Sequence, residues 1–286
     1  MKNQSLRQRY AIGRIFHLVC VGLTWLGVFV LFILLFHVSR EGVAWLDLQF
    51  LDSFPSRFPQ KAGIKSALLG TVWLISFTAT ISIPVGVAAA IYLEEYPKRS
   101  GISHFIEINI ANLAGVPSIV YGILGLVIFV RFMGFGRSIV AGSLTMSLLI
   151  LPVIIIAARE ALRAVPTSIR QSAFALGATH WQTIRSQVLP VALPGILTGV
   201  ILALSRAVGE TAPLIMIGAL TYVAFVPEGP MDPFTVLPIQ IFNWASRPQD
   251  EFHQVAAAGI IVLLVVLLMM NGVAIWIRHW AERRQR

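Results

Sequence analysis

The sequence predicts an all-α membrane protein with six transmembrane helices, and three observations support that prediction. The chain of 286 residues is 57% hydrophobic and only 12% charged, with a mean hydropathy of +0.79, whereas a soluble domain carries about twice that charged fraction. Long charge-free windows recur along the chain, and the basic residues between them are distributed unevenly. We therefore expect lipid to surround most of the chain, and helices are required there because lipid cannot satisfy free backbone amides.

Six windows are long enough to cross the hydrocarbon core, which needs about 20 apolar residues in a helix. They are Ile15–Ser39, Ser66–Leu93, Ile108–Val130, Ser138–Ala158, Ser186–Ser205 and Phe252–Ile277. The first is too long for the apolar region of a signal peptide and lacks a small-residue cleavage site, so we expect it to be a retained anchor. Its Cys20 is the only cysteine and can form no internal disulfide.

A seventh apolar window, Thr211–Pro227, is marginal in length and contains Pro213 and Gly218. Both ends of the chain are basic, which places both termini in the cytoplasm if the positive-inside rule holds. The number of crossings is then even, and six are expected. Thr211–Pro227 is predicted to extend the fifth span or to re-enter beside it as a broken helix.

The charged residues of the connecting segments agree with this topology. The predicted inside segments carry fourteen basic residues, namely Lys2, Arg7, Arg9, Arg14, Lys98, Arg99, Arg159, Arg163, Arg170, Arg185, Arg278, Arg283, Arg284 and Arg286. The predicted outside segments carry seven, together with seven acids. The net charge of +9 is therefore a topology signal, and the clustered basic face that nucleic-acid binding needs is not expected.

The segment Arg170–Gly177 between the fourth and fifth windows is basic and helix-forming. Pro166 suits the first turn of a short helix, and Gly177 is predicted to end that helix in the left-handed conformation. Thr179 and Gln182 have the spacing of a capping box for a second short helix. We predict an elbow of two helices outside the membrane, with exposed apolar side chains at Phe174, Leu176, Trp181 and Ile184.

This segment resembles the EAA loop of the permeases of bacterial ABC importers. The resemblance rests on Gln171-Ser-Ala173, on Gly177 and on Leu189-Pro190 twelve residues later. Gln171 replaces the usual Glu and Ser172 an Ala, and Gln187 stands where an aliphatic residue is common. The alternative is an amphipathic helix that lies on lipid. The resemblance implies that a separate ATPase docks on the elbow through Gln171, Ala173, Phe174, Leu176, Gly177 and Thr179.

Four further strings resemble the A-type permease subunit of phosphate-specific (Pst) ABC importers. They are Asn112–Gly122, Arg206–Thr211, Tyr222–Pro227 and Leu237–Gln249. This resemblance implies the type I importer permease (MetI-like) fold with a cytoplasmic coupling helix, in the bacterial inner membrane. It also implies three protein partners, which are a sister permease of the C type, a cytoplasmic ATPase dimer and a periplasmic phosphate-binding protein.

The resemblance divides the chain into three regions. Residues 1–65 would form a cytoplasmic tail, the first transmembrane helix and a periplasmic loop. Residues 66–280 would form the permease domain, and residues 281–286 a cytoplasmic tail.

The sequence contains no phosphate-binding G-x-x-x-x-G-K-[ST] loop, and none of its four lysines follows a glycine. We therefore expect no cofactor on this chain, with ATP and Mg²⁺ on the partner ATPase. Neither H-E-x-x-H nor G-x-S-x-G occurs, so membrane protease and esterase activities have no motif support. The chain is expected to perform no covalent chemistry.

Arg206 and Glu210 are the ionisable residues within the otherwise apolar region around the fifth span. Their i, i+4 spacing places them on one helix face. Charged residues inside a membrane usually face a cavity or one another, and the planar fork of donors of arginine suits a phosphate anion. Arg206 is the candidate for transient contact with phosphate, and Glu210 for holding Arg206. The alternative is an ion pair that only steadies the broken helix at Gly209 and Pro213.

Asn112, Ser118 and Tyr121 are further candidates, as neutral donors along the pathway. Interhelical hydrogen bonds are the commoner role of such residues. Pro117 is expected to kink the third span, and Gly115, Gly122 and Gly125 to allow close helix approach. The histidines are scattered, so a metal site is not expected.

We predict a permease subunit that forms half of a phosphate pathway. The alternatives are a permease for another oxyanion, such as sulfate or molybdate, and a membrane scaffold that transports nothing.

Overall fold

The structure is a computed structural model that describes residues 6–96, 101–219 and 222–283. The predicted topology charges Lys2, Lys98, Arg99, Arg284 and Arg286 lie outside the described residues. Within them the only β-structure is an isolated bridge between Ser138 and Pro233. The longer helices are α1 (Leu6–Gly42), α3 (Lys65–Glu95), α4 (Gly101–Ala114), α6 (Ile139–Arg163), α9 (Leu189–Gly209) and α12 (Asp250–Arg283). The shorter ones are α2 (Leu48–Asp52), α5 (Ser118–Gly125), α7 (Thr167–Ala175), α8 (His180–Thr183), α10 (Ala212–Ile217) and α11 (Leu237–Ala245), with 3-10 turns at 43–45 and 59–61 and π-helical segments at 126–132 and 184–188.

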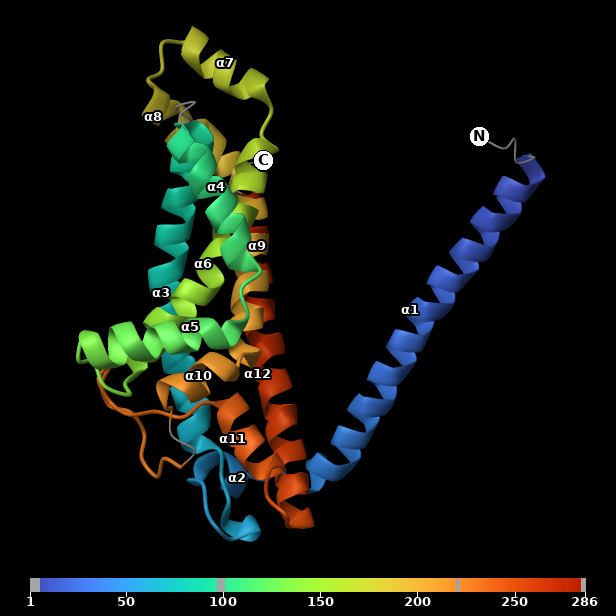
Figure 1. The fold of residues 1–286 in the computed structure, drawn as a ribbon, viewed down its shortest axis with the longest axis vertical. Coiled ribbons are helices and arrows are strands. Elements are labelled where there is room, and N and C mark those ends of the chain that lie inside the picture. Colours follow the sequence, from blue (N-terminus) through green and yellow to red (C-terminus); the bar gives the residue numbers. More distant parts are fainter. Residues whose placement is uncertain (1–5, 97–100, 220–221, 284–286) are drawn as a thin grey trace.

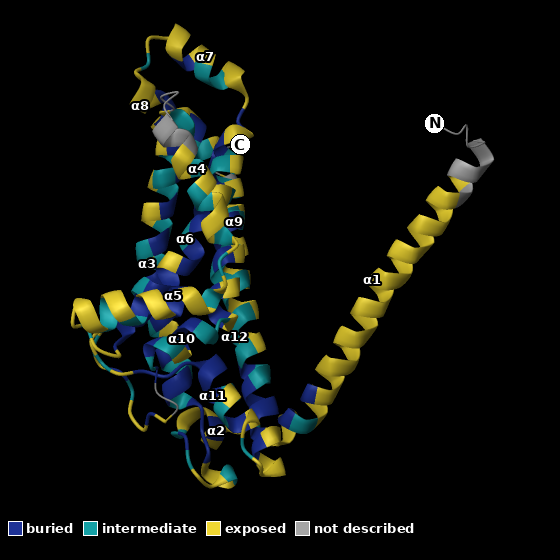
Figure 2. Ribbon diagram, viewed as in Figure 1, coloured by how far each residue is buried: buried dark blue, intermediate teal, exposed yellow. Residues whose placement is uncertain are grey.

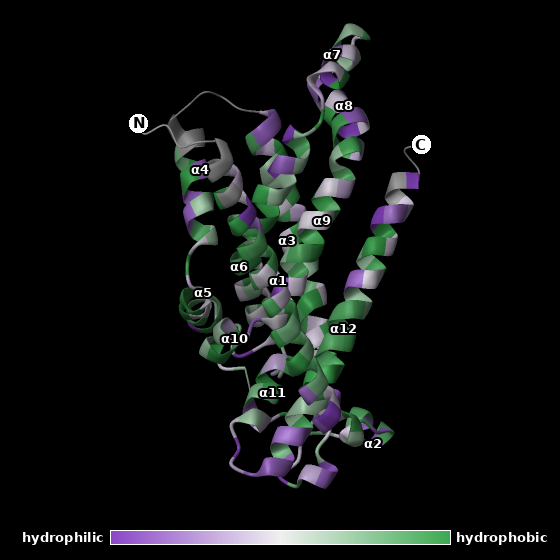
Figure 3. Ribbon diagram, turned by 90° about the vertical axis from the view of Figure 1, so that its right-hand side faces the viewer, coloured by the Kyte–Doolittle hydropathy of each residue, from purple (hydrophilic) through white to green (hydrophobic). Residues whose placement is uncertain are grey.

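Five helices of the described chain are long and apolar enough to cross a membrane, or six if a bent pair forms one span. The five coincide with the first, second, fourth, fifth and sixth predicted windows, with Ser138 of the fourth as the N-cap of its helix. Ser138 begins the fourth, because its hydroxyl accepts a hydrogen bond from the Ala141 amide at 3.3 Å. Hydrophobic residues line the middle of the bundle, and hydrophilic residues gather at its two ends (Figure 3). We call the end with α7 and α8 the elbow end, and the end with α2 and α11 the loop end (Figure 1).

The third predicted window, Ile108–Val130, is broken into two helices, so it forms one span only if this bent pair is counted as one. The helices α4 and α5 are bent by 105° relative to each other at the break between Ala114 and Ser118, and α5 lies across the bundle (Figure 1). Pro117 removes an amide donor and disfavours helical geometry in the residue before it. The predicted kink is thus a complete interruption of the helix.

Small residues then hold α5 in its crosswise position. A Cβ added to Gly122 would lie 2.7 Å from the Pro213 Cα in α10, and one added to Gly125 would lie 2.1 Å from Oγ1 of Thr145 in α6. Both positions were correctly expected to allow close approach. The same expectation was wrong for Gly115, because a Cβ added there would have as its nearest neighbour the Asn112 carbonyl oxygen, at an ordinary contact distance of 3.5 Å.

The helices α3 and α6 form the centre of the bundle, and serines join them. The hydroxyl groups of Ser143 and Ser147, one turn apart on α6, donate to the carbonyl oxygens of Leu74 and Thr78 at 3.3 and 3.4 Å. Interhelical hydrogen bonds of this kind replace the hydrophobic driving force that lipid does not supply. The loop end is tied to α3 in a similar way, because Oγ1 of Thr71 accepts from the Leu237 amide at 2.9 Å.

Helix α1 leaves the bundle and is exposed along most of its length (Figures 1 and 2). It contacts α12 near its C-terminal end, where Val38 is buried. A Cβ on Gly42 would lie 2.7 Å from backbone atoms of Ala257 and Ala258, so glycine permits this approach. The remaining apolar surface of α1 faces lipid or another protein.

The described residues of the seventh window, Thr211–Pro227, contain one short helix and no helix long enough to span a membrane. Its helix α10 has six residues and ends at Gly218, which is left-handed with φ +82°. It packs against α5 and buries Pro213, Leu214 and Ile217. This segment is therefore a short turn of helix after a break, beside the fifth span.

Candidate functional site

The predicted elbow forms at one end of the bundle. Helix α7 ends at Ala175 with Leu176 as its C-cap, and Gly177 follows in the left-handed region with φ +82°. The capping box is complete, because the Thr179 amide donates to Gln182 Oε1 at 2.8 Å and the Gln182 amide donates to Thr179 Oγ1 at 3.4 Å. These features confirm the sequence prediction of a turn between two helices.

Two details of the predicted elbow were wrong. The second helix is not separate, because α8 continues through the π-helical segment into α9 as one helix from His180 to Gly209. Ile184 is 1% exposed, since it lies where this helix meets the bundle, so it is no surface residue. Phe174, Leu176 and Trp181 are exposed as expected.

The other predicted docking residues divide between surface and core. Gln171, Gly177 and Thr179 are exposed, whereas Ala173 is buried. Ala173 therefore positions α7 on the helix beneath it, and the exposed residues form the outer face of the elbow.

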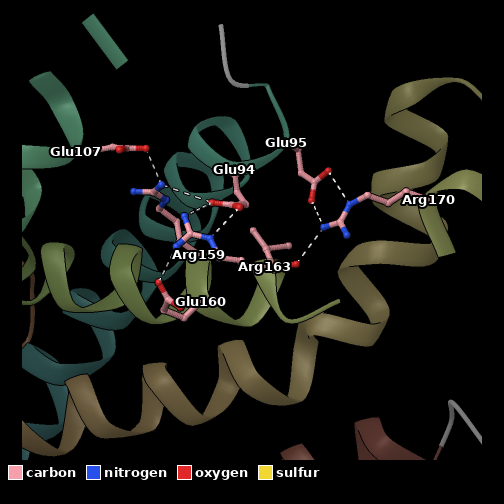
Figure 4. A network of polar contacts seen from close by, with 8 residues as sticks. Glu94, Glu95, Glu107, Arg159, Glu160, Arg163 and Arg170 are labelled. Atoms are coloured by element: carbon pink, nitrogen blue, oxygen red, sulfur yellow. Dashed lines mark hydrogen bonds and ion pairs between the residues drawn. The ribbon is translucent and has the colours of Figure 1, made fainter. Parts of the chain in front are cut away.

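A network of ion pairs holds the elbow to the bundle (Figure 4). Arg170 of α7 binds Glu95, the last residue of α3, through two nitrogens at 2.6 and 3.3 Å. The same guanidinium donates to the carbonyl oxygens of Val165 and Leu162 at 2.8 and 3.0 Å. Val165 follows α6, and the Leu162 carbonyl oxygen also accepts from the Val165 amide at 3.2 Å, so Arg170 binds backbone carbonyl groups at the C-terminal end of this helix. One side chain thus connects α7, α3 and α6.

The rest of the network joins α3, α4 and α6. Arg159 contacts Glu107 at 2.7 Å and Glu94 at 3.5 Å. Arg163 contacts Glu94 at 3.1 Å and Glu160 at 3.3 Å. The four helix ends at this side of the bundle are therefore linked by opposite charges (Figure 4).

The sequence prediction counted the arginines of this network as topology signals and missed their acidic partners. One signal was present: Glu94 and Glu95 adjoin at the end of the second window, on the side where the basic residues were placed. The pairing itself joins residues 75 positions apart, so it depends on tertiary structure.

Aromatic side chains also join α3 to the elbow. The ring of His180 meets Tyr96 edge to face with centroids 4.7 Å apart. The same ring stacks with Phe174 of α7, with centroids 6.0 Å apart. Contacts of this geometry add to the burial of the rings.

The predicted pair of Arg206 and Glu210 forms at the end of α9. Nε of Arg206 donates to Oε1 of Glu210 at 3.2 Å. Helix α9 ends at Gly209, Glu210 is extended with ψ 127°, and α10 begins two residues later. The Arg206 side chain is 54% exposed and that of Glu210 is 18% exposed.

Asn112, Ser118 and Tyr121 lie around the break between α4 and α5. The Tyr121 hydroxyl donates to the Leu113 carbonyl oxygen across the break at 2.8 Å, and its side chain is buried. Asn112 is exposed and Ser118 is half-buried. This break and the one at Glu210 are connected because α5 packs against α10.

No group of three or more potential metal ligands of the His, Cys, Asp or Glu type occurs among the described residues. The arrangement offers two functional features instead. One is an exposed apolar face anchored to several helices, and the other is a pair of interrupted helices with an arginine at the break.

Comparisons with known proteins give a consistent result. Residues 82–286 match the family described as binding-protein-dependent transport system inner membrane component. The chain is 33% identical to phosphate transport system permease protein PstA 1 of Mycobacterium tuberculosis over 88% of this chain and 80% of that protein. It is 32% identical to phosphate transport system permease protein PstA of Yersinia pestis over 87% of this chain and 83% of that protein. Among solved structures, a chain of a bacterial alginate ABC transporter matches with a TM-score of 0.67, 15% identity and coverage of 95% and 96%, which supports the fold alone.

Proposed function

Because the chain belongs to the family of binding-protein-dependent transport system inner membrane components, it is a multi-pass permease subunit, and we propose that it conducts inorganic phosphate in an ATP-driven importer. The evidence that phosphate is the substrate is the similarity to two permeases named for phosphate transport, over 87% and 88% of this chain. The chemistry of the break at Glu210 is compatible with an anion, because an arginine is exposed there.

We propose that the elbow docks a cytoplasmic ATPase. Phe174, Leu176 and Trp181 present apolar surface beyond the end of the bundle, and Gln171, Gly177 and Thr179 flank them. Exposed apolar side chains mark a site of interaction with a protein or a membrane, and the resemblance of this segment to the EAA loop supports a protein partner. ATP and Mg²⁺ would bind to that ATPase, since the sequence of this chain contains no phosphate-binding loop.

Arg206 is proposed to contact phosphate during passage. Its guanidinium suits a tetrahedral oxyanion, and the neighbouring Glu210 carboxylate reduces the net positive charge. A weak site is useful in a pathway because the ion must leave as well as enter. Asn112, Ser118 and Tyr121 would line the pathway near the second break. The hydroxyl hydrogen of Tyr121 is engaged with Leu113, so that residue would act mainly by positioning α5.

This function requires further subunits. We propose a sister permease that completes the pathway, two copies of the ATPase and a periplasmic phosphate-binding protein. The elbow end would then face the cytoplasm together with both termini, and the loop end the periplasm. The exposed apolar surface of α1 (Figure 2) would be covered by lipid and by the sister permease.

Uptake of radiolabelled phosphate into proteoliposomes tests the proposal. The vesicles would hold this chain, its sister permease and the ATPase, with the binding protein outside. We expect uptake that requires ATP and this chain and is unchanged by excess sulfate or molybdate. Uptake suppressed by either oxyanion would identify a different substrate. Absence of uptake from an assembled complex with an active ATPase would favour a scaffold.

A further inference from the structure

The C-terminal end of α3 contacts both helices of the elbow, α7 and α8. The contacts are made by Glu95, the last residue of α3, and by Tyr96, its C-cap. Glu95 binds Arg170 of α7 at 2.6 Å, and Tyr96 meets His180 of α8 with ring centroids 4.7 Å apart. Phe174, on the proposed docking face, stacks on the same histidine. The end of α3 is thus enclosed by the elbow, although α3 is distant from it in sequence.

The ion pair is shielded from solvent. The Glu95 side chain is 6% exposed and that of Arg170 is 19% exposed. The Arg163–Glu160 pair in the same network is 54% and 65% exposed. Exposed pairs of that kind contribute little because solvent screens them, whereas loss of one partner of a shielded pair leaves a charge without compensation. The Glu95–Arg170 contact therefore holds α7 to α3 more firmly than an exposed ion pair would.

The contact also has a defined geometry. Arg170 uses two nitrogens for the carboxylate and, through its terminal nitrogens, binds backbone carbonyl oxygens at the C-terminal end of α6. A two-pronged contact of this kind fixes orientation as well as distance. Movement of α7 would consequently be passed to α3 and α6 together.

Helix α3 can carry such movement to the opposite end of the bundle. It is one helix from Lys65 to Glu95, it receives the hydrogen bonds of Ser143 and Ser147 from α6, and Thr71 near its start binds the first residue of α11. The link at Glu95 therefore connects the elbow with the loop end through a continuous helix.

We infer that Glu95 is a positioning residue: by holding Arg170, it makes α3 follow α7 when a docked ATPase displaces the elbow. This inference rests on the proposed function, and it adds the helix that receives the movement. In the absence of the ion pair, the elbow would still bind the ATPase through Phe174, Leu176 and Trp181. It would then move without drawing α3 with it, and ATP hydrolysis would be separated from transport.

The test compares Glu95→Gln with Glu160→Gln in the complete complex. Both changes remove one carboxylate charge from the same network, but Glu160 contacts only the exposed Arg163 among the described residues. In the same proteoliposomes, ATP hydrolysis and uptake of radiolabelled phosphate are measured. For Glu95→Gln we expect normal retention of the ATPase, continued hydrolysis and at least about a tenfold fall in phosphate taken up per ATP, which corresponds to roughly 1.4 kcal/mol. Glu160→Gln should resemble the unmodified chain.

A distance measurement makes the test independent of the substrate. Spin labels are attached to cysteines that replace Val85 of α3 and Ser172 of α7, both exposed, in a chain with Cys20→Ser. The distribution of distances between the two labels should be narrow when Glu95 is present. It should be at least about twice as wide with Glu95→Gln, because α3 and α7 then reorient independently. If the unmodified complex fails to take up phosphate, the proposed function is wrong. The distance distribution still shows whether Glu95 couples α3 to α7.

Three results would overturn the inference. They are an uptake per ATP within twofold of the unmodified complex, an unchanged distance distribution, and loss of ATPase binding, which would mean that the pair shapes the docking face. If Glu95→Gln does not accumulate in the membrane, Arg170→Lys serves in its place, since it keeps the cation and removes the two-pronged contact. The same fall in coupling is expected from it.

Discussion

Nε of Arg206 donates to Oε1 of Glu210 over 3.2 Å, and the guanidinium is much more exposed than the carboxylate it binds. Within the described part of the chain, Nε is the only nitrogen of Arg206 with a hydrogen bond. The carboxylate therefore orients the side chain from one edge, and the terminal nitrogens can bind an anion at the break between α9 and α10.

Replacement of Arg206 by Gln is expected to reduce phosphate uptake by at least about tenfold while the complex still assembles. A hydrogen bond to a charged group contributes about 1.5–3 kcal/mol, and about 1.4 kcal/mol corresponds to a factor of ten. Uptake by proteoliposomes and co-purification of the subunits are the measurements. Arg57→Gln is a control, because Arg57 lies on the Phe58 ring in the loop after α2. Loss of assembly with Arg206→Gln would instead assign the pair a structural role.

The exposed leucine of the elbow offers a sharper test of docking. Leu176 is 89% exposed, so Leu176→Asp should not disturb folding, but it would place a charge in an apolar contact with the ATPase. We expect the amount of ATPase that co-purifies to fall at least about tenfold, because burial of an unpaired charge costs several kcal/mol. Leu48→Asp is the matched control, since Leu48 is 85% exposed at the loop end. Equal retention of ATPase by both variants would contradict docking at the elbow.

The hydropathy of the sequence was sufficient to place five of the six predicted spans, because a helix in lipid needs a continuous apolar run. At Ile108–Val130 hydropathy marked the apolar stretch but not the break within it, because the composition is equally apolar on both sides of the break. The 105° bend arises from Pro117 together with packing that no local pattern reports. Gly122 and Gly125 fit against α10 and α6, and these contacts determine the direction of α5.

The elbow was predictable for a different reason. Its turn depends on Gly177 and on a capping box, both of which act over three or four residues. Its attachment was not predictable, since Glu95 and Arg170 are 75 residues apart. The burial of Ile184 was missed because the second helix of the elbow was expected to be short and separate. It continues into the bundle instead, and Ile184 lies where it enters.

Gly177→Ala probes the backbone of the elbow without a steric clash. A Cβ at this position meets nothing within 4 Å, but φ is +82°. Left-handed geometry costs an alanine about 1–2 kcal/mol, so α7 should fray and affinity for the ATPase should fall about tenfold. Gly177→Asn should be milder, because asparagine tolerates this region. Titration of the reconstituted permease with ATPase measures the affinity, and Gly22→Ala, in open space on α1, is the control. An unchanged affinity for Gly177→Ala would show that the turn does not shape the docking face.

Gly125→Ala tests whether the crosswise helix α5 is held by close packing. The new methyl group would lie 2.1 Å from Oγ1 of Thr145 and 2.7 Å from its Cγ2. Thr145 is fully buried, and its hydroxyl donates to the Ala141 carbonyl oxygen at 2.7 Å, so rotation of its side chain would break that hydrogen bond.

Either α5 must then move away from α6, or the side chain must leave its preferred rotamer. Overpacking of this kind costs about 1–3 kcal/mol, which predicts a lower midpoint of thermal unfolding in detergent by about 2–4 °C per kcal/mol. Gly115→Ala, near the break but with its nearest neighbour at 3.5 Å, should leave the midpoint unchanged. If the two variants unfold at the same temperature, α5 does not rest on α6 in the folded permease. The close approach of Gly122 to Pro213 of α10 would then be the contact that keeps α5 across the bundle.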